Sequence, residues 1–353
     1  MYTKRKYSVK NMVLWTRRET VLLALIALVP VVAYEALDQK WLHLPWLPIA
    51  VVGTAVAFII SFQNNASYDR VWEARKIWGG IVNASRAWGF AAKDFVTRDF
   101  TEEAVSDAEL SAIQQELVCR HVAWLTALRH AMRQERPWEH ALQHPTNKEW
   151  AAMIGVREHR HSLEEELDGN VPPEELAYIL SKSNKPAQIL AIQSRRLREL
   201  RTRRLIEDFR HMEMQNLLNE LVALQGKSER IKNFPYPRQY ASLNYYFMWI
   251  FVVLLPFGVM FEFGKIGNEM AAAYPTIGKY FVWLSIPFSA LVMWVFHTME
   301  RIGRSSENPF EGTPNDVPIT TIARGIEIDL RQMIDQDPSD IPAPIEPQYD
   351  TQT

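Results

Sequence analysis

The chain has 353 residues, of which 39 are Lys or Arg and 41 are Asp or Glu, so its formal net charge is -2. No basic patch is interleaved with aromatic residues, so we expect no nucleic-acid partner. The single cysteine, Cys119, excludes an intrachain disulfide. Long apolar runs toward both ends flank a charged block, and the 12 Trp residues suit a membrane protein with interfacial aromatic belts.

The first apolar run covers residues 20–37 and, at about 1.5 Å per residue, is near the short end of a membrane-spanning helix. Basic residues precede it, whereas the connection at residues 38–46 has Lys40 as its only Lys or Arg. Lys and Arg concentrate on the cytoplasmic side of membrane proteins. We therefore expect residues 1–19 to be cytoplasmic and residues 20–66 to hold the first two transmembrane helices.

The second apolar run, residues 47–62, leads directly into a polar and charged helix. Thr54, Phe58 and Phe62 recur at i, i+4 and i+8, so they lie on one face of that helix. Such a face lines a pore or packs against neighbouring helices, and packing is its more common use. The residues alone leave both interpretations open.

Polar and charged side chains follow this face along the same helix: Asn64, Asn65, Asp69, Arg70, Glu73 and Arg75. Arg70 and Glu73 stand at the i, i+3 spacing of an ordinary helix-surface ion pair. We interpret the cluster as hydrogen bonding between helices or between subunits, in preference to direct contact with ions.

Residues 67–237 are charged and carry apolar residues at helical spacing, which predicts a large helical cytoplasmic domain. His159 and His161 stand close to three Glu residues, but no further ligand spacing supports a metal site. We interpret that stretch as a solvated, charged loop. The basic run at residues 195–204 is interpreted as a solvated helix face, with an anion lining or a contact to lipid headgroups as the alternatives.

Two further apolar runs lie within residues 238–298 and predict the third and fourth transmembrane helices. Each of them contains an internal proline, Pro256 and Pro287. With the N-terminus inside, four spans place the C-terminus in the cytoplasm as well.

The remainder of the chain divides into two parts. Residues 299–334 are predicted to dock on the cytoplasmic helices through an amphipathic helix that Asp316 can cap. Residues 335–353 are acidic and rich in Pro, which predicts a disordered tail.

The motifs of common enzyme classes are absent from the sequence: no Walker loop, no G-x-G-x-x-G, no G-x-S-x-G and no H-E-x-x-H. The apolar runs also contain almost no ionisable residue, whereas coupled transporters and membrane enzymes usually place one within the bilayer. We therefore expect neither an enzyme nor a cofactor. A secondary transporter or exporter, and a membrane-anchored sensor or scaffold, remain alternatives to an ion channel.

Residues 62–89, FQNNASYDRVWEARKIWGGIVNASRAWG, resemble the signature of bacterial bestrophin-like proteins. Residues 119–133, 228–258 and 307–333 resemble three later stretches of the same family, in the same order. Together these matches cover the chain except for roughly residues 134–190, and the four-span layout agrees with them.

The resemblance implies an all-α homopentamer in the bacterial inner membrane, around one central pore that conducts small inorganic ions passively. It implies that Thr54, Phe58 and Phe62 line a narrow hydrophobic neck that gates by dewetting. Aligning residues 217–220 with the family places Met212 at a second constriction on the cytoplasmic side. The sequence does not decide whether such a pore would select anions or cations.

The resemblance also bears on calcium. Animal bestrophins follow an Asn-Pro-Phe element with a dense acidic run that helps to coordinate Ca²⁺. Here Asn308-Pro309-Phe310 is followed only by Glu311 and Asp316 as acidic candidates. Calcium prefers six to eight oxygen ligands, so we expect no bound metal.

Overall fold

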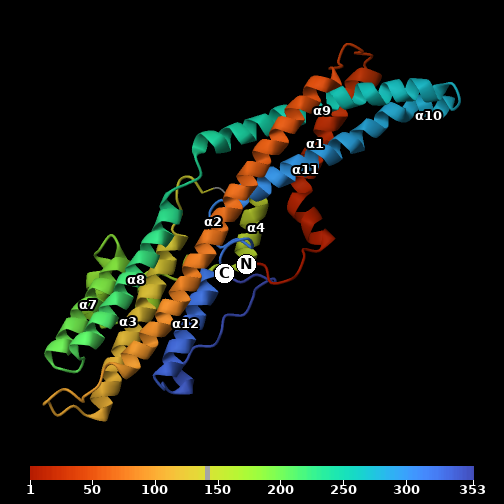
Figure 1. Ribbon diagram of the computed structural model, residues 1–353. Helices are drawn as coiled ribbons and strands as arrows, with labels where there is room; N and C mark the ends of the chain where they lie inside the picture. The colour runs from red at the N-terminus through yellow and green to blue at the C-terminus, as the bar shows by residue number, and fades with distance from the viewer. Residues whose placement is uncertain (140–143) are drawn as a thin grey trace. The chain divides into compact units, whose positions relative to one another are not determined.

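The computed structural model describes residues 1–139 and 144–353, whose regular secondary structure is helical apart from isolated bridges near the chain ends. Contacts divide the chain into two compact units, whose longer helices are labelled in Figure 1. The membrane unit consists of Arg5–Asp69 and Tyr236–Glu307. The polar unit consists of Met1–Lys4, Arg70–Pro235 and Asn308–Thr353.

Three segments of the described chain are long and apolar enough to cross a bilayer: α2 (Trp46–Asp94), α9 (Arg238–Ala271) and the stretch Pro275–Ser305. The first helix, α1 (Val9–Glu35), is not among them. Its uncharged part, residues 20–34, is shorter than the about 20 residues that a spanning helix needs. Length and composition therefore give three candidate spans, where the sequence predicted four.

The two internal prolines are accommodated differently. Helix α9 continues through Pro256 without a break. The last apolar stretch instead divides into α10 (Pro275–Tyr280), η3 (Phe281–Leu284) and α11 (Ser285–Ser305). Pro287 consequently lies in the first turn of α11. The N–H groups of a first turn have no acceptor within the helix, so the N–H that proline lacks costs no hydrogen bond there.

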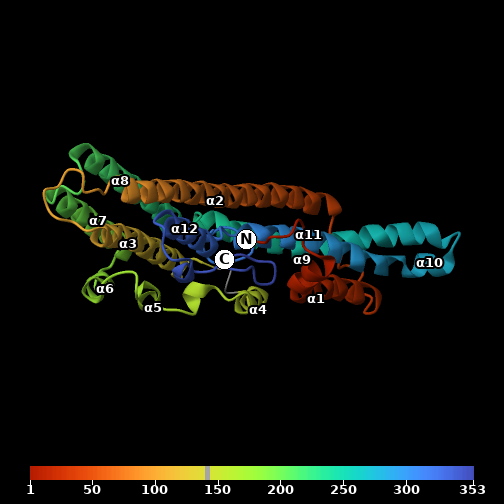
Figure 2. The ribbon, with the colours of Figure 1, turned by 90° about the horizontal axis from the view of Figure 1, so that it is seen from below.

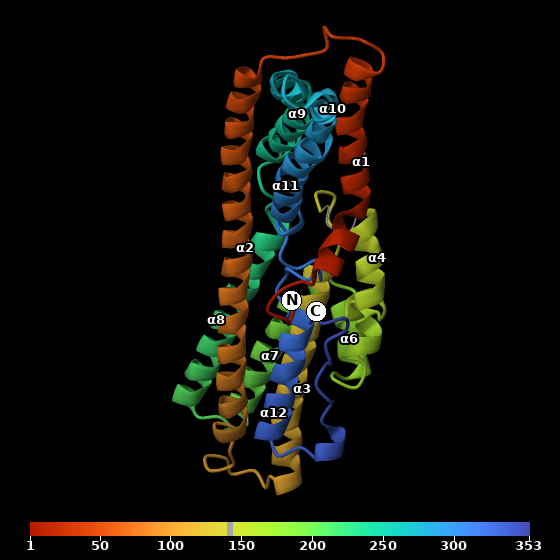
Figure 3. The ribbon, with the colours of Figure 1, turned by 90° about the vertical axis from the view of Figure 1, so that its right-hand side faces the viewer.

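Within the membrane unit, α1, α9 and α11 pack against one another, as Figure 3 shows. Their buried core includes Leu23, Phe251 and Met293, together with Val56 of α2. Gly53 allows α2 to approach α9 closely, because a Cβ atom at that position would lie 2.5 Å from Cε2 of Phe251. A larger side chain there would force the Phe251 ring to move.

The polar unit combines long helices with several short ones. In chain order its further helices are α3 (Asp107–Arg133), α4 (Pro145–Ile154), η2 (Arg157–His159), α5 (Leu163–Leu167), α6 (Pro173–Leu180), α7 (Lys185–Thr202), α8 (Asp208–Asn233), α12 (Ile319–Met333) and η4 (Pro338–Asp340). Figure 2 shows the short helices α5 and α6 flanking α3 and α7. The core of the unit includes three fully buried indoles, Trp78, Trp88 and Trp124.

The docking helix of the C-terminal segment is α12, which buries Ile319, Ile326 and Leu330 in the core of the polar unit. The prediction that Asp316 caps this helix is wrong, because Pro318 occupies the cap position. Asp316 instead accepts hydrogen bonds from the backbone N–H and the hydroxyl of Thr313, each at 2.8 Å, and so closes the preceding turn.

The end of the tail lies against the N-terminus rather than apart from the unit (Figure 3). Tyr2 and Thr351 form an isolated antiparallel bridge, and Lys4 Nζ lies 2.6 Å from the carboxylate of Asp350. The backbone N–H of Thr321 on α12 donates to the carbonyl of Thr353 at 2.8 Å. The composition of residues 335–353 predicts disorder, whereas in the structure the end of the tail bonds to residues that are distant in the sequence.

Candidate functional site

The face of α2 that carries Thr54, Phe58 and Phe62 is exposed in the structure. The two aromatic side chains are 63% and 70% exposed, respectively. The hydroxyl of Thr54 donates to the carbonyl of Ala50 at 2.9 Å, so it is bonded within the helix. No other part of the described membrane unit buries the two rings, and the face is available to a partner, to lipid or to a pore.

The opposite face of α2 is bound by buried polar groups. Gln63 accepts a hydrogen bond from Asn244 of α9 at 2.9 Å, and both residues are 2% exposed. Ser67 donates to the carbonyl of Gly303 on α11 at 2.7 Å, and Asn64 donates to another α11 carbonyl at 3.2 Å. An unmade hydrogen bond in an apolar surrounding is costly, so these bonds set the rotation of α2 about its axis.

Sequence reasoning singled out Asn64 but missed Gln63, Ser67 and Asn244. A signal was present in the pattern. Gln63 and Ser67 are one helical turn apart, on a face that is otherwise apolar, and Asn244 is a polar residue within an uncharged run long enough to span a membrane. Polar residues placed this way in membrane helices usually bond to a neighbouring helix.

Arg70 and Glu73, whose i, i+3 spacing allows an ion pair with each other, both bond to residues at the C-terminal end of α8. Arg70 donates to the carbonyls of Phe234 and Ile231, at 2.8 and 2.9 Å. Glu73 forms an ion pair with Arg230. The last carbonyls of a helix have no intrahelical partner, so Arg70 is drawn to the C-terminal end of α8 instead of to its neighbour on α2.

Asn65, Asp69 and Arg75 are exposed on α2. The guanidinium of Arg75 lies 5.7 Å from the ring centroid of Trp72, and no other contact of Arg75 is seen in the described residues. Asn65 continues the face of Phe58 and Phe62 toward the polar unit. The signature cluster therefore splits into residues that join helices and residues that remain free to meet a partner.

Met212 belongs to the polar unit, unlike Thr54, Phe58 and Phe62. It is exposed near the start of α8, one turn from the equally exposed Phe209. The start of α8 thus presents two large apolar side chains that the described residues leave uncovered.

The two calcium candidates are buried and bonded to neighbouring side chains. Glu311 accepts a hydrogen bond from Asn308 at 2.8 Å, and Asp316 closes its own turn. Burial, reinforced by the negative charges of Asp316 and Glu139, raises the pKa of Glu311 to about 8. Its neutral form is a poor cation ligand, and the described residues contain no cluster of three or more His, Cys, Asp or Glu that suits a metal.

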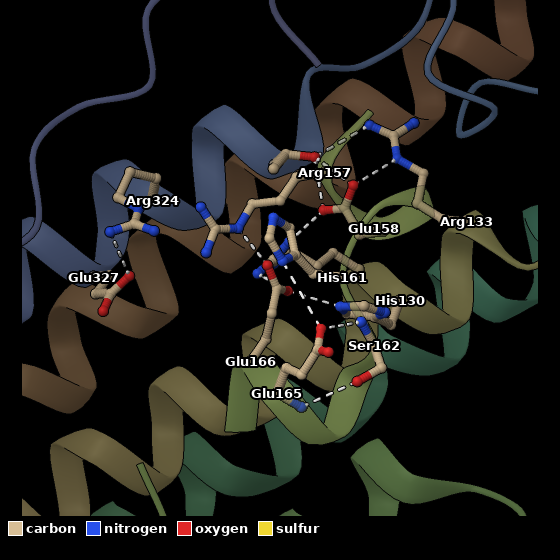
Figure 4. Close-up of polar contacts among 12 residues, drawn as sticks. His130, Arg133, Arg157, Glu158, His161, Ser162, Glu165, Glu166, Arg324 and Glu327 are labelled. Carbon is tan, nitrogen blue, oxygen red and sulfur yellow. Dashed lines mark hydrogen bonds and ion pairs between the residues drawn. The ribbon is translucent and has the colours of Figure 1, made fainter. Parts of the chain in front are cut away.

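The stretch around His159 is less solvated than the sequence suggested. Glu158 and Glu166 are buried in a charge network that Figure 4 shows. Arg129 of α3 pairs with both carboxylates, and His130 lies 2.7 Å from Glu166. Although burial alone raises the pKa of Glu166, the hydrogen bond to His130 and the positive charge of Arg129 lower it to about 2.

This network extends to the C-terminal segment. The hydroxyl of Thr320 on α12 donates to Glu158 at 2.8 Å, and the buried Arg133 donates to the carbonyl of Phe310 at 2.7 Å. The charges therefore tie α3, the segment at residues 157–166 and α12 together. Removing one member would leave a buried charge without its counterion.

Most of the basic run at residues 195–204 is paired inside the polar unit. Arg196 binds Glu116 at 2.9 Å, Arg201 binds Asp208 at 2.6 Å and Arg203 binds both Glu103 and Glu109. These carboxylates reduce the field that the run projects, which agrees with a solvated helix face. Cys119 is partly buried on α3, and burial raises the pKa of its thiol.

The sequence of the chain is similar to those of known membrane proteins. Residues 6–332 match the family model described as Bacterial/Fungal Bestrophin protein. Voltage-dependent anion channel-forming protein YneE of Escherichia coli K12 is 26% identical over 301 residues, which cover 85% of this chain and 80% of that protein. The corresponding RSc3414 protein of Ralstonia nicotianae is 25% identical over 301 residues, or 83% and 81% of the two chains.

A solved structure has the same fold. The crystal structure of a bacterial Bestrophin homolog from Klebsiella pneumoniae superposes with a TM-score of 0.70 at 22% identity. The match covers 90% of this chain and 98% of that one.

The buried bond between Gln63 and Asn244 predicts a strongly non-additive pair of substitutions. Asn244→Leu alone leaves the Gln63 amide unpaired, which costs about 1–3 kcal/mol, whereas Gln63→Leu/Asn244→Leu removes both partners and costs less than the sum of the single changes. Unfolding of purified protein in a denaturing detergent titration measures the cycle. Additive single effects would show that the bond does not orient α2.

The raised pKa of Glu311 predicts a defined pH dependence of stability. The unfolded carboxyl ionises near its ordinary value of 4.5 and the folded one near 8, so the stability contributed by this group falls as pH rises through that window. Glu311→Gln should remove this loss of stability, and the variant's unfolding temperature should exceed that of wild type by an amount that grows from pH 5 and is largest at pH 9. Thermal unfolding from pH 5 to 9 measures this difference.

The exposed carboxylate Glu174 provides the matched control. Glu174→Gln should leave the pH profile of wild type unchanged. Equal profiles for Glu311→Gln and wild type would mean that Glu311 ionises normally in the folded protein.

Proposed function

Because the chain belongs to the bacterial bestrophin family, we propose that it forms a homopentameric channel through which small anions cross the bacterial inner membrane passively. It is an all-helical, multi-pass membrane protein of a family that forms anion channels and is not an enzyme. The sequence left the conducted ion open. The relatives' names, which describe anion channels, support chloride and similar anions over cations.

The exposed aromatic face of α2 is the observation that carries this proposal. Buried hydrogen bonds on the opposite face orient α2, so Phe58 and Phe62 point away from the rest of their own subunit. In a pentamer around α2, each phenylalanine would contribute a ring of five side chains. Two such rings form a hydrophobic neck that closes by dewetting and needs no ion-binding group.

The residues that flank the two rings suit the same role. Thr54 adds a small polar side chain at one end of the face, and Asn65 continues it at the other. A surface in which polar groups flank a pair of aromatic rings is better matched to a wetted pore than to lipid tails. Thr54 makes the outer end of the neck easier to wet than an aliphatic residue would. Met212, with Phe209 beside it, is the corresponding candidate for a second constriction at the cytoplasmic end.

We assign α1 as a fourth span, with both chain ends in the cytoplasm. Val21, Leu25 and Val29 are exposed on α1, as expected of a helix that meets lipid. Thr16 and Glu19 on its other side are buried, and Arg301 of α11 binds Glu19 at 3.1 Å. The basic residues before this helix support the cytoplasmic placement of the N-terminus.

Currents across a planar bilayer test the function directly. In a KCl gradient, purified protein should give a current whose reversal potential moves toward the equilibrium potential of chloride. Movement toward the potassium potential would reverse the proposed selectivity. Absence of current in wild type and in the neck variants would favour a transporter or a scaffold.

The neck assignment predicts a gain of conduction. Phe58→Ala/Phe62→Ala widens the neck and removes apolar surface that excludes water, so single-channel conductance or open probability should rise several-fold. The control is Phe288→Ala, which removes an exposed ring on α11 of the same unit and should leave the current unchanged. Currents from the double variant that match wild type would exclude these rings as the gate.

A further inference from the structure

We propose that the first turns of α1 and the residues before them form a binding site for anionic phospholipid headgroups of the cytoplasmic leaflet. The charged part of the site is Lys6 and Lys10, and the apolar part is Leu14. This inference rests on the proposed placement of the N-terminus in the cytoplasm.

The length of α1 brings these residues to headgroup depth. The helix has 27 residues, which at the rise of an α-helix makes it about 40 Å long, whereas the hydrocarbon core of a bilayer is about 30 Å thick. The uncharged stretch of α1 begins at Thr20. The turns before Thr20 therefore extend beyond the acyl chains into the layer of glycerol and phosphate groups.

One side of α1 continues from the acyl chains into this layer. Lys10, Leu14, Val21 and Leu25 follow at spacings of four, seven and four residues, which places them on one side of the helix. Leu14, Val21 and Leu25 are 41%, 62% and 51% exposed. An exposed leucine beside lysines at the end of a lipid-facing stripe is the pattern of a helix segment that lies in the interface.

The positive charges of Lys6 and Lys10 are not neutralised by a carboxylate among the described residues. Residues 1–18 contain no Asp or Glu, and the first carboxylate, Glu19, is bound to Arg301. Lys6 and Lys10 are exposed and form no ion pair within the described residues, whereas Lys4 pairs with Asp350. Two ammonium groups without a carboxylate partner, one of them a helical turn from the exposed Leu14, suit a lipid phosphate better than a soluble anion, which would not use the apolar contact.

The other side of α1 holds the segment in place. Arg301 donates to the carbonyl of Trp15 at 2.9 Å, and its guanidinium lies 4.0 Å from the Trp15 ring centroid. Thr16 is buried and donates to the carbonyl of Met12 at 3.0 Å. The two Arg301 contacts fix α1 against α11 around Trp15, so that Lys10 and Leu14 keep their outward direction when no lipid is bound.

Lipid retention tests the site on the full-length protein. Wild type is reconstituted into vesicles of equal parts phosphatidylglycerol and phosphatidylcholine and extracted in mild detergent, and native mass spectrometry counts the lipids that each subunit retains. Wild type should retain phosphatidylglycerol preferentially, and the preference should fall in high salt. Lys6→Gln/Lys10→Gln should reduce it by roughly 30-fold at low salt, because each lysine near an anionic surface contributes roughly fivefold.

Two further variants separate the parts of the site. Lys148→Gln/Lys227→Gln removes the same charge from exposed lysines of the polar unit and should retain the wild-type preference. Leu14→Ser should lower the retention of both lipids and leave the preference between them intact. An unchanged preference in Lys6→Gln/Lys10→Gln, or an equal loss in Lys148→Gln/Lys227→Gln, would overturn the proposal.

Anion flux through the same vesicles distinguishes this proposal from the proposed function. Flux with no phosphatidylglycerol preference would refute the lipid site alone. A preference that depends on Lys6 and Lys10 without any flux would refute the channel alone. The intact oligomer peak in each spectrum shows that the variant has folded.

Discussion

The structure of the membrane unit depends on one constraint, which is that the buried amides and hydroxyl on α2 must find partners away from water. Gln63 finds Asn244 on α9, and Ser67 finds the carbonyl of Gly303 on α11. A rotation of α2 would break these bonds inside an apolar core, so the helix has one favoured orientation. The exposure of Phe58 and Phe62 is a consequence of that orientation, because they lie on the side opposite to the bonded groups.

In the polar unit, buried charged groups must likewise find partners away from water. Glu158 and Glu166 are buried, and they are tolerated because Arg129 and His130 face them within hydrogen-bonding distance. Thr320 carries the same network to α12, a helix far away in the sequence. The C-terminal segment is thus held by specific polar geometry in addition to the apolar stripe of α12.

Features that depend on neighbours along one helix were predictable from the sequence, and features that depend on distant partners were not. The shared face of Thr54, Phe58 and Phe62 follows from the helical period alone. The particular partners of Arg70 could not be named from the sequence, because the carbonyls at the end of α8 lie more than 150 residues away. The carboxylates near His159 looked solvated because nothing local shows that Arg129 covers them.

Cys119 has a practical consequence for following the motion of α2. Its thiol is partly buried and its pKa is raised, so at neutral pH little of it is the reactive thiolate. The chain has no other cysteine. A cysteine introduced on the exposed face of α2 would therefore be labelled first, and distances between spin labels or fluorophores on the subunits of the proposed pentamer would report on that helix without a cysteine-free background.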